Sequence, residues 1–307
     1  MQRYILLRFL QGLIALTLLS MLVFGLARAS GDPLHMILPM DARQEDYDQA
    51  RQVLGLDKPL PVQYAIFISG IVKGDFGTSL RARRPVSELL RERLPNSFKL
   101  AIVSMIFAML LAFPLGVVAA VKRGTLADSF AKLVAVLGQS LPSFVLGIVL
   151  IEIFSVRFRI LPVAGTGSFS HYILPAFTLG IFTVAGMVRL LRSSLLEVLD
   201  AEYIKLARIK GLSETIVIWK HALKNALTSV MTFSALQFAS VVTISVVVEV
   251  VFAWPGLGRL AYEAIMYRDF PVIEGIVLLA AVIVIGVNAI VDILYAYIDP
   301  RIRYRRV

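Results

Sequence analysis

Six long runs of apolar residues most constrain what this chain of 307 residues can fold into. A helix rises about 1.5 Å per residue, so roughly 17 to 25 such residues cross a hydrocarbon core about 30 Å thick. The runs are continuous and do not alternate with period two, which predicts helices and excludes the strands of a membrane barrel. They cover residues 9–27, 100–121, 133–156, 172–188, 226–248 and 271–291. We therefore expect an all-α polytopic membrane protein with six transmembrane helices.

The composition excludes several other classes of protein. Hydrophobic residues make up 58% of the chain and charged residues 17%, against about 45–50% and about 25% in a soluble domain. A soluble enzyme, a disordered chain and a fibrous protein are therefore excluded. The chain has no cysteine, which excludes a disulfide framework, a thiolate nucleophile and a cysteine metal site.

The distribution of basic residues predicts the orientation in the membrane. With the N-terminus inside, the short inner segments carry 16 Lys and Arg and the short outer loops carry four, as the positive-inside rule requires. We therefore attribute the net charge of +10 to membrane topology and expect no nucleic-acid partner. Both termini are predicted to be cytoplasmic. The first apolar run is longer than the roughly 7–15 residues of a signal peptide, so we interpret it as a retained helix.

Two segments between the spans are too long to be simple connections. The outer one, residues 30–97, contains amphipathic stretches at 45–54 and 62–72 and is expected to form short helices. The inner one, residues 192–225, reads as a helix, a glycine elbow and a second helix. Asp200 is placed to cap a helix through residues 201–210, Gly211 to stop it with Leu212 as a hydrophobic clamp, and Ser213 to cap a helix ending near Asn225.

The first helix of the inner segment has an apolar face, and helical periodicity does not say what that face contacts. Tyr203, Leu206, Ala207 and Lys210 recur at helical spacing, and Glu202 and Lys205 are placed for an ion pair. The face could dock in the groove of a soluble partner. It could equally lie on the inner leaflet, with its basic residues against anionic lipid.

The inner segment also carries a family resemblance. The string EYIKLARIKGL at residues 202–212 resembles the EAA-type loop of ABC importer permeases of the dipeptide, oligopeptide and nickel branch, although Ile209 stands where the family usually has a small residue. The chain resembles the first of the two permeases of such a system. The likeness also rests on His221–Leu227, Leu54–Leu60, Gly74–Ser79, Arg84–Val86, Leu161–Gly165, Ile173–Ala176, Trp254–Arg259 and Asp299–Arg303.

The resemblance implies a subunit of an ATP-driven importer in a bacterial-type inner membrane. It implies a second permease, two cytosolic P-loop ATPases and an extracytoplasmic substrate-binding protein as partners. The chain lacks the G-x-x-x-x-G-K-[ST] phosphate loop, so ATP and Mg²⁺ belong to the ATPases. We expect the chain itself to be no enzyme and to bind no cofactor or metal. The implied coupling residues are Glu202, Tyr203, Leu206, Ala207, Arg208, Lys210, Gly211 and Leu212.

Three carboxylates near the outer ends of the spans are candidates for a second role. Glu152, Glu249 and Glu274 could receive the cationic amine of a peptide. They could instead be structural anchors for nearby arginines, which is the interpretation we favour. The outer loop also contains a G-x-G-x-x-A pattern at residues 256–261, but no βαβ unit surrounds it. We interpret it as a turn in which Trp254 anchors at the membrane interface.

The expected cargo is a dipeptide or oligopeptide, with nickel chelates, glutathione or another small solute as alternatives. A more distant alternative is a secondary transporter driven by an ion gradient, which would often show matched, broken repeats and ionisable residues at the midplane. An intramembrane hydrolase is disfavoured, since the chain has no G-x-S-x-G motif and no histidine within a span.

Overall fold

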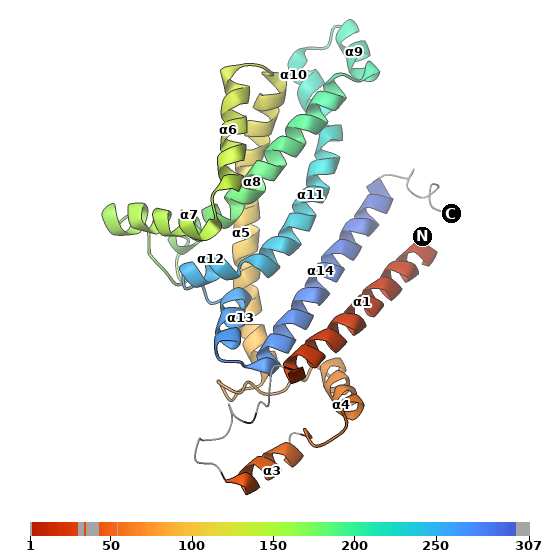
Figure 1. Cartoon of the computed structure of the whole chain (residues 1–307). Coiled ribbons are helices and arrows are strands. Elements are labelled where there is room, and N and C mark those ends of the chain that lie inside the picture. Colours follow the sequence, from red (N-terminus) through yellow and green to blue (C-terminus); the bar gives the residue numbers. More distant parts are fainter. Residues whose placement is uncertain (1, 30–33, 35–42, 54, 299–307) are drawn as a thin grey trace. The chain divides into compact units, whose positions relative to one another are not determined.

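A computed structural model describes residues 2–29, 34, 43–53 and 55–298. Apart from an isolated bridge between Thr78 and Pro85, the regular structure of these residues is helical, which confirms the all-α expectation (Figure 1). The chain divides into two compact units, one of residues 1–96 and 256–307 and the other of residues 97–255. The motif at Asp299–Arg303 and residues 30–33 and 35–42 of the outer segment lie outside the described residues.

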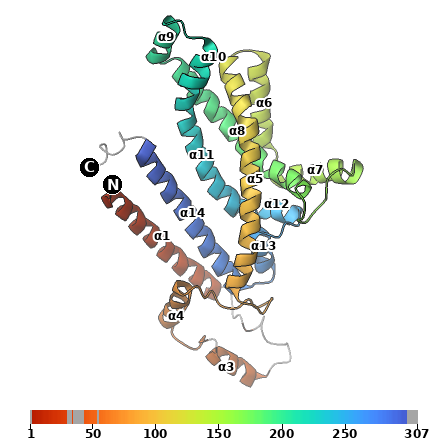
Figure 2. The same ribbon diagram turned by 180° about the vertical axis from the view of Figure 1, so that it is seen from behind.

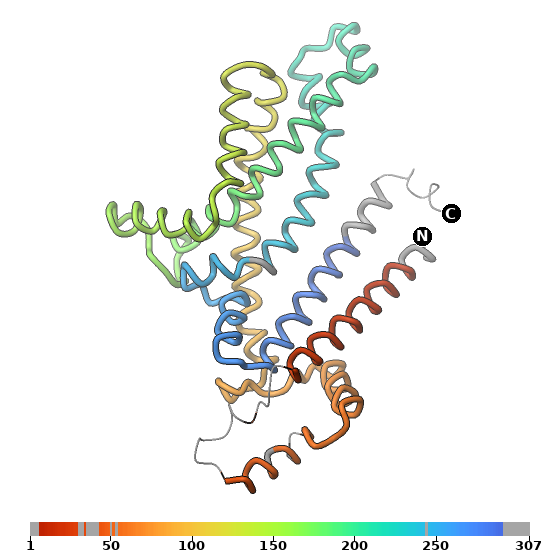
Figure 3. Tube along the Cα trace, in the orientation of Figure 1, coloured from red at the N-terminus to blue at the C-terminus, as the bar shows by residue number. Residues whose placement is uncertain are grey.

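The first unit is built on two long helices that run side by side. Helix α1 (Gln2–Ala29) packs against α14 (Phe270–Ile298), as Figures 1 and 3 show. At Gly12 the two helices approach so closely that a Cβ atom would lie 2.8 Å from Ile285. The unit also contains α3 (Gln44–Val53), α4 (Leu60–Val72), the start of α5 (Val86–Val121) and α13 (Leu257–Met266). Both predicted amphipathic stretches of the outer segment are therefore helices.

A tight turn before α5 is fastened to the turn between α13 and α14. The carboxylate of Asp269 accepts hydrogen bonds from the Ser79 hydroxyl at 2.5 Å and from the Leu80 backbone N–H at 3.0 Å. The guanidinium of Arg81 lies 3.6 Å from the centre of the Tyr267 ring. These contacts tie segments almost 190 residues apart in the sequence, so the turn has a fixed place within its unit.

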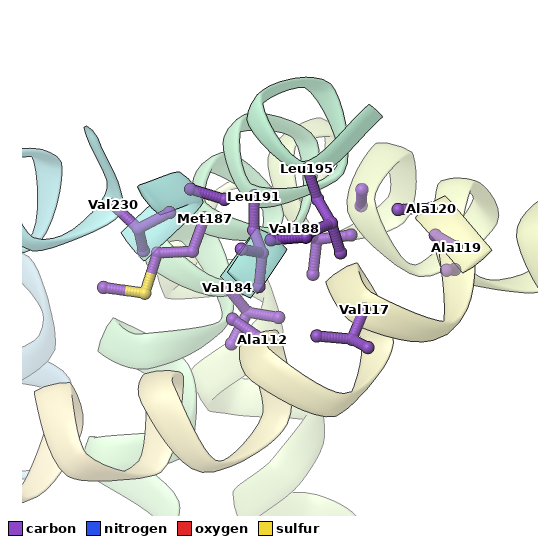
Figure 4. Packing of buried hydrophobic residues seen from close by; sticks show 14 of the residues in the cluster. Ala112, Val117, Ala119, Ala120, Val184, Met187, Val188, Leu191, Leu195 and Val230 are labelled. Atoms are coloured by element: carbon purple, nitrogen blue, oxygen red, sulfur yellow. The ribbon is translucent and has the colours of Figure 1, made fainter. Parts of the chain in front are cut away.

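Helix α8 (Ser170–Leu199) is the centre of the second unit. It packs against α5, α6 (Leu126–Ser140) and α11 (Leu223–Ile244). The shared core consists of alanines, branched aliphatic side chains and two methionines, among them Val184, Met187 and Leu191 (Figure 4). Glycines allow the backbones to approach closely, because a Cβ on Gly138 would lie 2.9 Å from the Ile181 carbonyl oxygen. Small residues at helix contacts are the usual means of packing in membranes.

The third predicted span is not the continuous helix expected over residues 133–156. Helix α6 ends at Ser140, and a second segment, α7 (Ser143–Leu150) followed by the π-helix η1 (Ile151–Arg157), leaves at an angle of 102°. The cause is Pro142, which disfavours the helical conformation at the residue before it. Leu141 is accordingly extended, with φ −90° and ψ 124°.

The fifth predicted span also differs at both ends. The helix that begins after Ser213 was expected to end near Asn225, but α10 (Glu214–Ile216), the π-helix η2 (Val217–Ala222) and α11 follow one another without a break. No glycine or proline lies between Ser213 and Ser245, so no residue stops the helix. At Ser245 the chain turns into the short α12 (Val246–Val251).

Five helices among the described residues are long and apolar enough to cross a membrane, and six if the bent pair counts as one span. They include α1, α5, α8 and α14, together with residues 214–242. The apolar runs thus predicted where the spans lie, and the breaks within them follow from local backbone chemistry.

Candidate functional site

The elbow predicted in the inner segment lies at one end of the second unit, beside the turn that joins α5 and α6 (Figures 1 and 2). Helix α9 (Glu202–Ile209) is followed by Lys210 at its C-cap, and then by Gly211 with φ 81°. The N–H of Gly211 donates to the Arg208 carbonyl at 2.9 Å, and the N–H of Leu212 to the Ala207 carbonyl at 3.3 Å. This pair of bonds is a Schellman motif. The left-handed stop at Gly211 is therefore confirmed.

The expected cap of α9 is wrong by one residue. Ala201, with φ −70° and ψ 146°, precedes the first helical residue and has no side chain to cap it. Asp200 instead ends α8 in a helical conformation, with φ −85° and ψ −5°. A capping residue needs an extended backbone, so Asp200 is unable to act for α9. Ser213 does occupy the cap position of α10, although its side chain makes no capping hydrogen bond.

The two sides of α9 have different surroundings. Ile204 and Ala207 are 0% and 8% exposed and pack in the core of the second unit. Leu206 and Ile209 are 56% and 80% exposed. Ala207 was expected on the face that meets a partner, but this chain already covers it. An aspartate there would bury a charge in the protein's own core.

We call the exposed apolar residues of this end the elbow face. It consists of Tyr203, Leu206, Ile209, Leu212, Ile216 and Trp219. The last two are not among the residues that the sequence patterns single out, and Ile209 is noted there only as a departure from the family pattern. Ile216 and Trp219 are three residues apart, a spacing that places them on one face of a helix. This spacing identifies them only if the helix after Ser213 is known to continue into α11. An apolar patch next to charged residues is typical of an interaction surface.

Polar contacts hold α9 in place around this face. The Arg208 guanidinium donates to Glu214 at 2.7 Å across the elbow, and the Asn225 side chain donates to the Tyr203 hydroxyl at 2.8 Å. The predicted pair of Glu202 and Lys205 is present at 2.8 Å. The Glu202 carboxylate raises the pKa of Lys205 above its usual value through this hydrogen bond.

A buried ion cluster at the same end joins α6 to α8, and no pattern in the sequence predicts it. The Asp128 carboxylate is buried and accepts two hydrogen bonds from Arg192, at 2.8 and 3.1 Å. Lys132 and the backbone N–H of Gly124 add two more, at 2.8 and 3.1 Å. The residues at its centre are 64 positions apart, too far for helix periodicity to relate them. The cluster fixes α8 about two turns before the helix ends at Leu199 and leads towards α9.

The three outer carboxylates do not share one site. Glu152 is exposed and pairs with Arg157 at 3.1 Å, as an anchor would. Glu249 is fully buried in the second unit, where the hydroxyls of Ser97 and Ser245 each donate to it at 2.7 Å. Glu274 belongs to the first unit and lines a cavity there.

Trp254 is covered by this chain, whereas the sequence predicts an anchor exposed at the membrane interface. It is fully buried in the second unit and packs edge-on against Tyr172, with ring centres 4.7 Å apart. Within residues 2–29, 34, 43–53 and 55–298, no group of three or more His, Cys, Asp or Glu side chains could hold a metal ion.

Two family models match most of this chain. Residues 112–304 match the family model described as "binding-protein-dependent transport system inner membrane component", and residues 1–101 match the model of its N-terminal part. The chain is 44% identical over 306 residues to the glutathione transport system permease protein GsiC of Salmonella typhimurium, covering 99% of this chain and 100% of that protein. The GsiC protein of Escherichia coli K12 is 42% identical over the same shares.

Solved structures show a similar fold at lower identity. The inward-facing MetNI methionine ABC transporter has a chain that superposes with a TM-score of 0.58 at 19% identity, covering 69% of this chain and 96% of that one. An amino acid ABC transporter with histidines gives a TM-score of 0.57 at 15% identity, covering 69% and 94%. These structures support the helical permease architecture.

Proposed function

The chain belongs to the family of binding-protein-dependent inner-membrane transport components, the permeases of ABC importers, and we propose that it forms one half of a pathway for short peptides. In this proposal its partners are a second permease, two ATPases that hydrolyse ATP beneath it, and a binding protein that delivers cargo from outside. The chain itself carries out no chemistry. Both termini and the elbow lie in the cytoplasm.

The elbow face carries the proposal. It is an apolar surface of at least two turns, held rigidly by the Schellman motif and by the ion pair of Arg208 with Glu214. An amphipathic helix that presents such a surface fits the groove of a soluble protein. We propose that the exposed side of α9 docks on an ATPase, with Glu202, Tyr203, Leu206, Arg208 and Lys210 at the contact, and that Gly211 and Leu212 set its angle.

Coupling would follow from the connections of α9. Ile204 and Ala207 pack in the core around α8, and the helix after the elbow is continuous with α11. A push on α9 therefore acts on both helices at once. Closure of the ATPases would shift the equilibrium between inward-open and outward-open states by this route.

The identity of the cargo rests on similarity. The relatives named above are glutathione transport permeases, and glutathione is a tripeptide, so a dipeptide or tripeptide is the cargo we propose. Nickel chelates and other small solutes are the alternatives within the same family.

Two matched glycine variants test the docking. Gly211 and Gly124 both lie in turns at positive φ, 81° and 80°, and a Cβ on either would meet nothing within 4 Å. Valine at either position costs about 1–2 kcal/mol of backbone strain. We expect Gly211→Val and Leu206→Asp to abolish co-purification of the ATPases and ATP-dependent uptake of glutathione, while Gly124→Val keeps both. Full retention of both in Gly211→Val and Leu206→Asp would contradict the docking role.

A further inference from the structure

The first unit contains a cavity of about 450 Å³. It is lined by the end of α1, the turn before α4, one side of α4, the segment leading to α5 and the first turn of α14. Its apolar wall includes Phe67, Phe76 and Phe270. Small-molecule sites are typically concave, mostly apolar and of about 300–1,000 Å³, with a few placed polar groups. This cavity has that form.

Glu274 is the feature of the cavity that most needs an explanation. Its side chain lines the cavity and the residue is only 9% exposed. Within the part of the chain that the structure describes, it makes no hydrogen bond and no ion pair within 4.0 Å. The guanidinium of Arg28, on the same cavity, acts on this carboxylate electrostatically without forming such a pair. A buried carboxylate without a partner is costly, so a cation bound in the cavity would stabilise it.

Arg28 is held in a fixed position across the cavity. Its Nε donates to the Gln63 side-chain oxygen at 2.9 Å. The Gln63 amide in turn donates to the backbone carbonyls of Leu56 at 3.2 Å and Lys58 at 2.8 Å. Gln63 is itself buried, so this chain of bonds pre-orients the guanidinium. Among the described residues no bond engages the two terminal nitrogens of Arg28, which leaves them for a carboxylate on a ligand.

We propose that this cavity binds a short zwitterionic peptide, with its ammonium group at Glu274 and its carboxylate at Arg28. Lys73 and Asp75 line the cavity from exposed positions and repeat the same two charges at its edge. The apolar wall between them suits small side chains. The inference rests on the proposed function, which supplies such a ligand, and it adds a binding site for the cargo between the ends of α1 and α14 and part of the outer segment.

The test measures binding of three probes to the full-length chain in lipid nanodiscs by saturation-transfer NMR titration. The probes are L-alanyl-L-alanine, its N-acetyl derivative without the ammonium, and its amide without the carboxylate. A charge-assisted hydrogen bond contributes on the order of a tenfold factor in affinity. We expect the unmodified dipeptide to bind about tenfold more tightly than either derivative. Equal binding of all three probes would overturn the inference.

Variants test whether the tighter binding of the unmodified dipeptide depends on the cavity. We expect Glu274→Gln to weaken binding of the dipeptide about tenfold and to abolish its advantage over the N-acetyl derivative. The control Glu152→Gln removes an exposed carboxylate paired with Arg157 and is expected to change nothing. If Glu274→Gln retains the preference for the free ammonium, the inference is wrong.

A second pair of variants does not alter the buried groups. Ser69 is an exposed residue of α4 that lines the cavity, and Val72 is an exposed residue of the same helix that does not. Ser69→Trp is expected to fill the cavity and abolish dipeptide binding, and Val72→Trp to preserve it. Uptake by the whole transporter is measured in parallel. Peptide uptake with no effect of Ser69→Trp or Glu274→Gln would refute this site alone, whereas no peptide uptake by the wild type would refute the proposed cargo.

Discussion

A close approach between α5 and α8 yields a stability prediction that can be worked from distances. A Cβ atom on Gly180 would lie 2.9 Å from the backbone carbonyl oxygen of Ser104 and 2.8 Å from the Phe107 ring. Ordinary contact begins at 3.4 Å. The ring can rotate aside, but the carbonyl belongs to the helix itself. Gly180→Ala therefore forces the two helices about 0.5 Å apart along this contact, a gap that forfeits a quarter or more of each dispersion contact it affects.

The magnitude follows from two opposing effects. Overpacking of a core costs about 1–3 kcal/mol, whereas replacing glycine by alanine within a helix gains about 1 kcal/mol. We expect a net loss of about 1 kcal/mol in the free energy of unfolding. At about 2.1 cal/mol/K of unfolding entropy per residue, a loss of this size lowers the Tm of a chain of 307 residues by about 1.5 °C.

A matched control isolates the role of the close contact. Gly286 lies within α14, and a Cβ there would meet nothing within 4 Å, so Gly286→Ala is expected to raise Tm by about 1.5 °C. Both variants are compared with the wild type by thermal unfolding of the purified chain in one detergent. A Tm for Gly180→Ala equal to or above that of Gly286→Ala would refute the reasoning.

Three further changes test single interactions by the same assay. The buried Thr183 hydroxyl has no hydrogen-bond partner among the described residues, so Thr183→Val should raise the unfolding free energy by about 1 kcal/mol; a lower Tm would indicate a partner for it. Asp128→Asn should lower Tm, because it leaves Arg192 and Lys132 without their shared carboxylate; an unchanged Tm would show that the cluster adds no stability. Glu202→Gln should leave Tm unchanged, since the pair with Lys205 is exposed, and a clear loss would contradict that reading.

The sequence predicts the spans well because each depends on one local quantity, the length of an apolar run. It also predicts the stop at Gly211, since the Schellman motif is built from neighbouring residues. Proline is a less reliable predictor of a helix break, because one proline of this chain interrupts a span and another does not. Pro175 lies inside α8 without ending it, whereas Pro142 marks a bend of 102°.

The rest of the candidate site depends on contacts between distant residues. Helix periodicity identifies the apolar side of α9 but does not say which residues this chain covers and which it leaves exposed, so Ala207 and Leu206 were placed together. Only the packing of α9 against the core of the second unit separates them. The hydrogen bond from Ser97 to Glu249 is likewise not predictable from local sequence, since the two residues lie 152 positions apart.

The most direct test of the central claim is whether the elbow face touches an ATPase. The chain has no cysteine, so a single introduced cysteine carries a photo-crosslinker at one known position. In membranes that contain the whole transporter, we expect Leu206→Cys and Ile209→Cys to crosslink to the ATPase. The control Gln11→Cys, at an exposed residue of α1 in the first unit, is expected to label without doing so. Absence of an ATPase adduct from both elbow positions, with lipid adducts in its place, would contradict the account and assign α9 to the membrane surface.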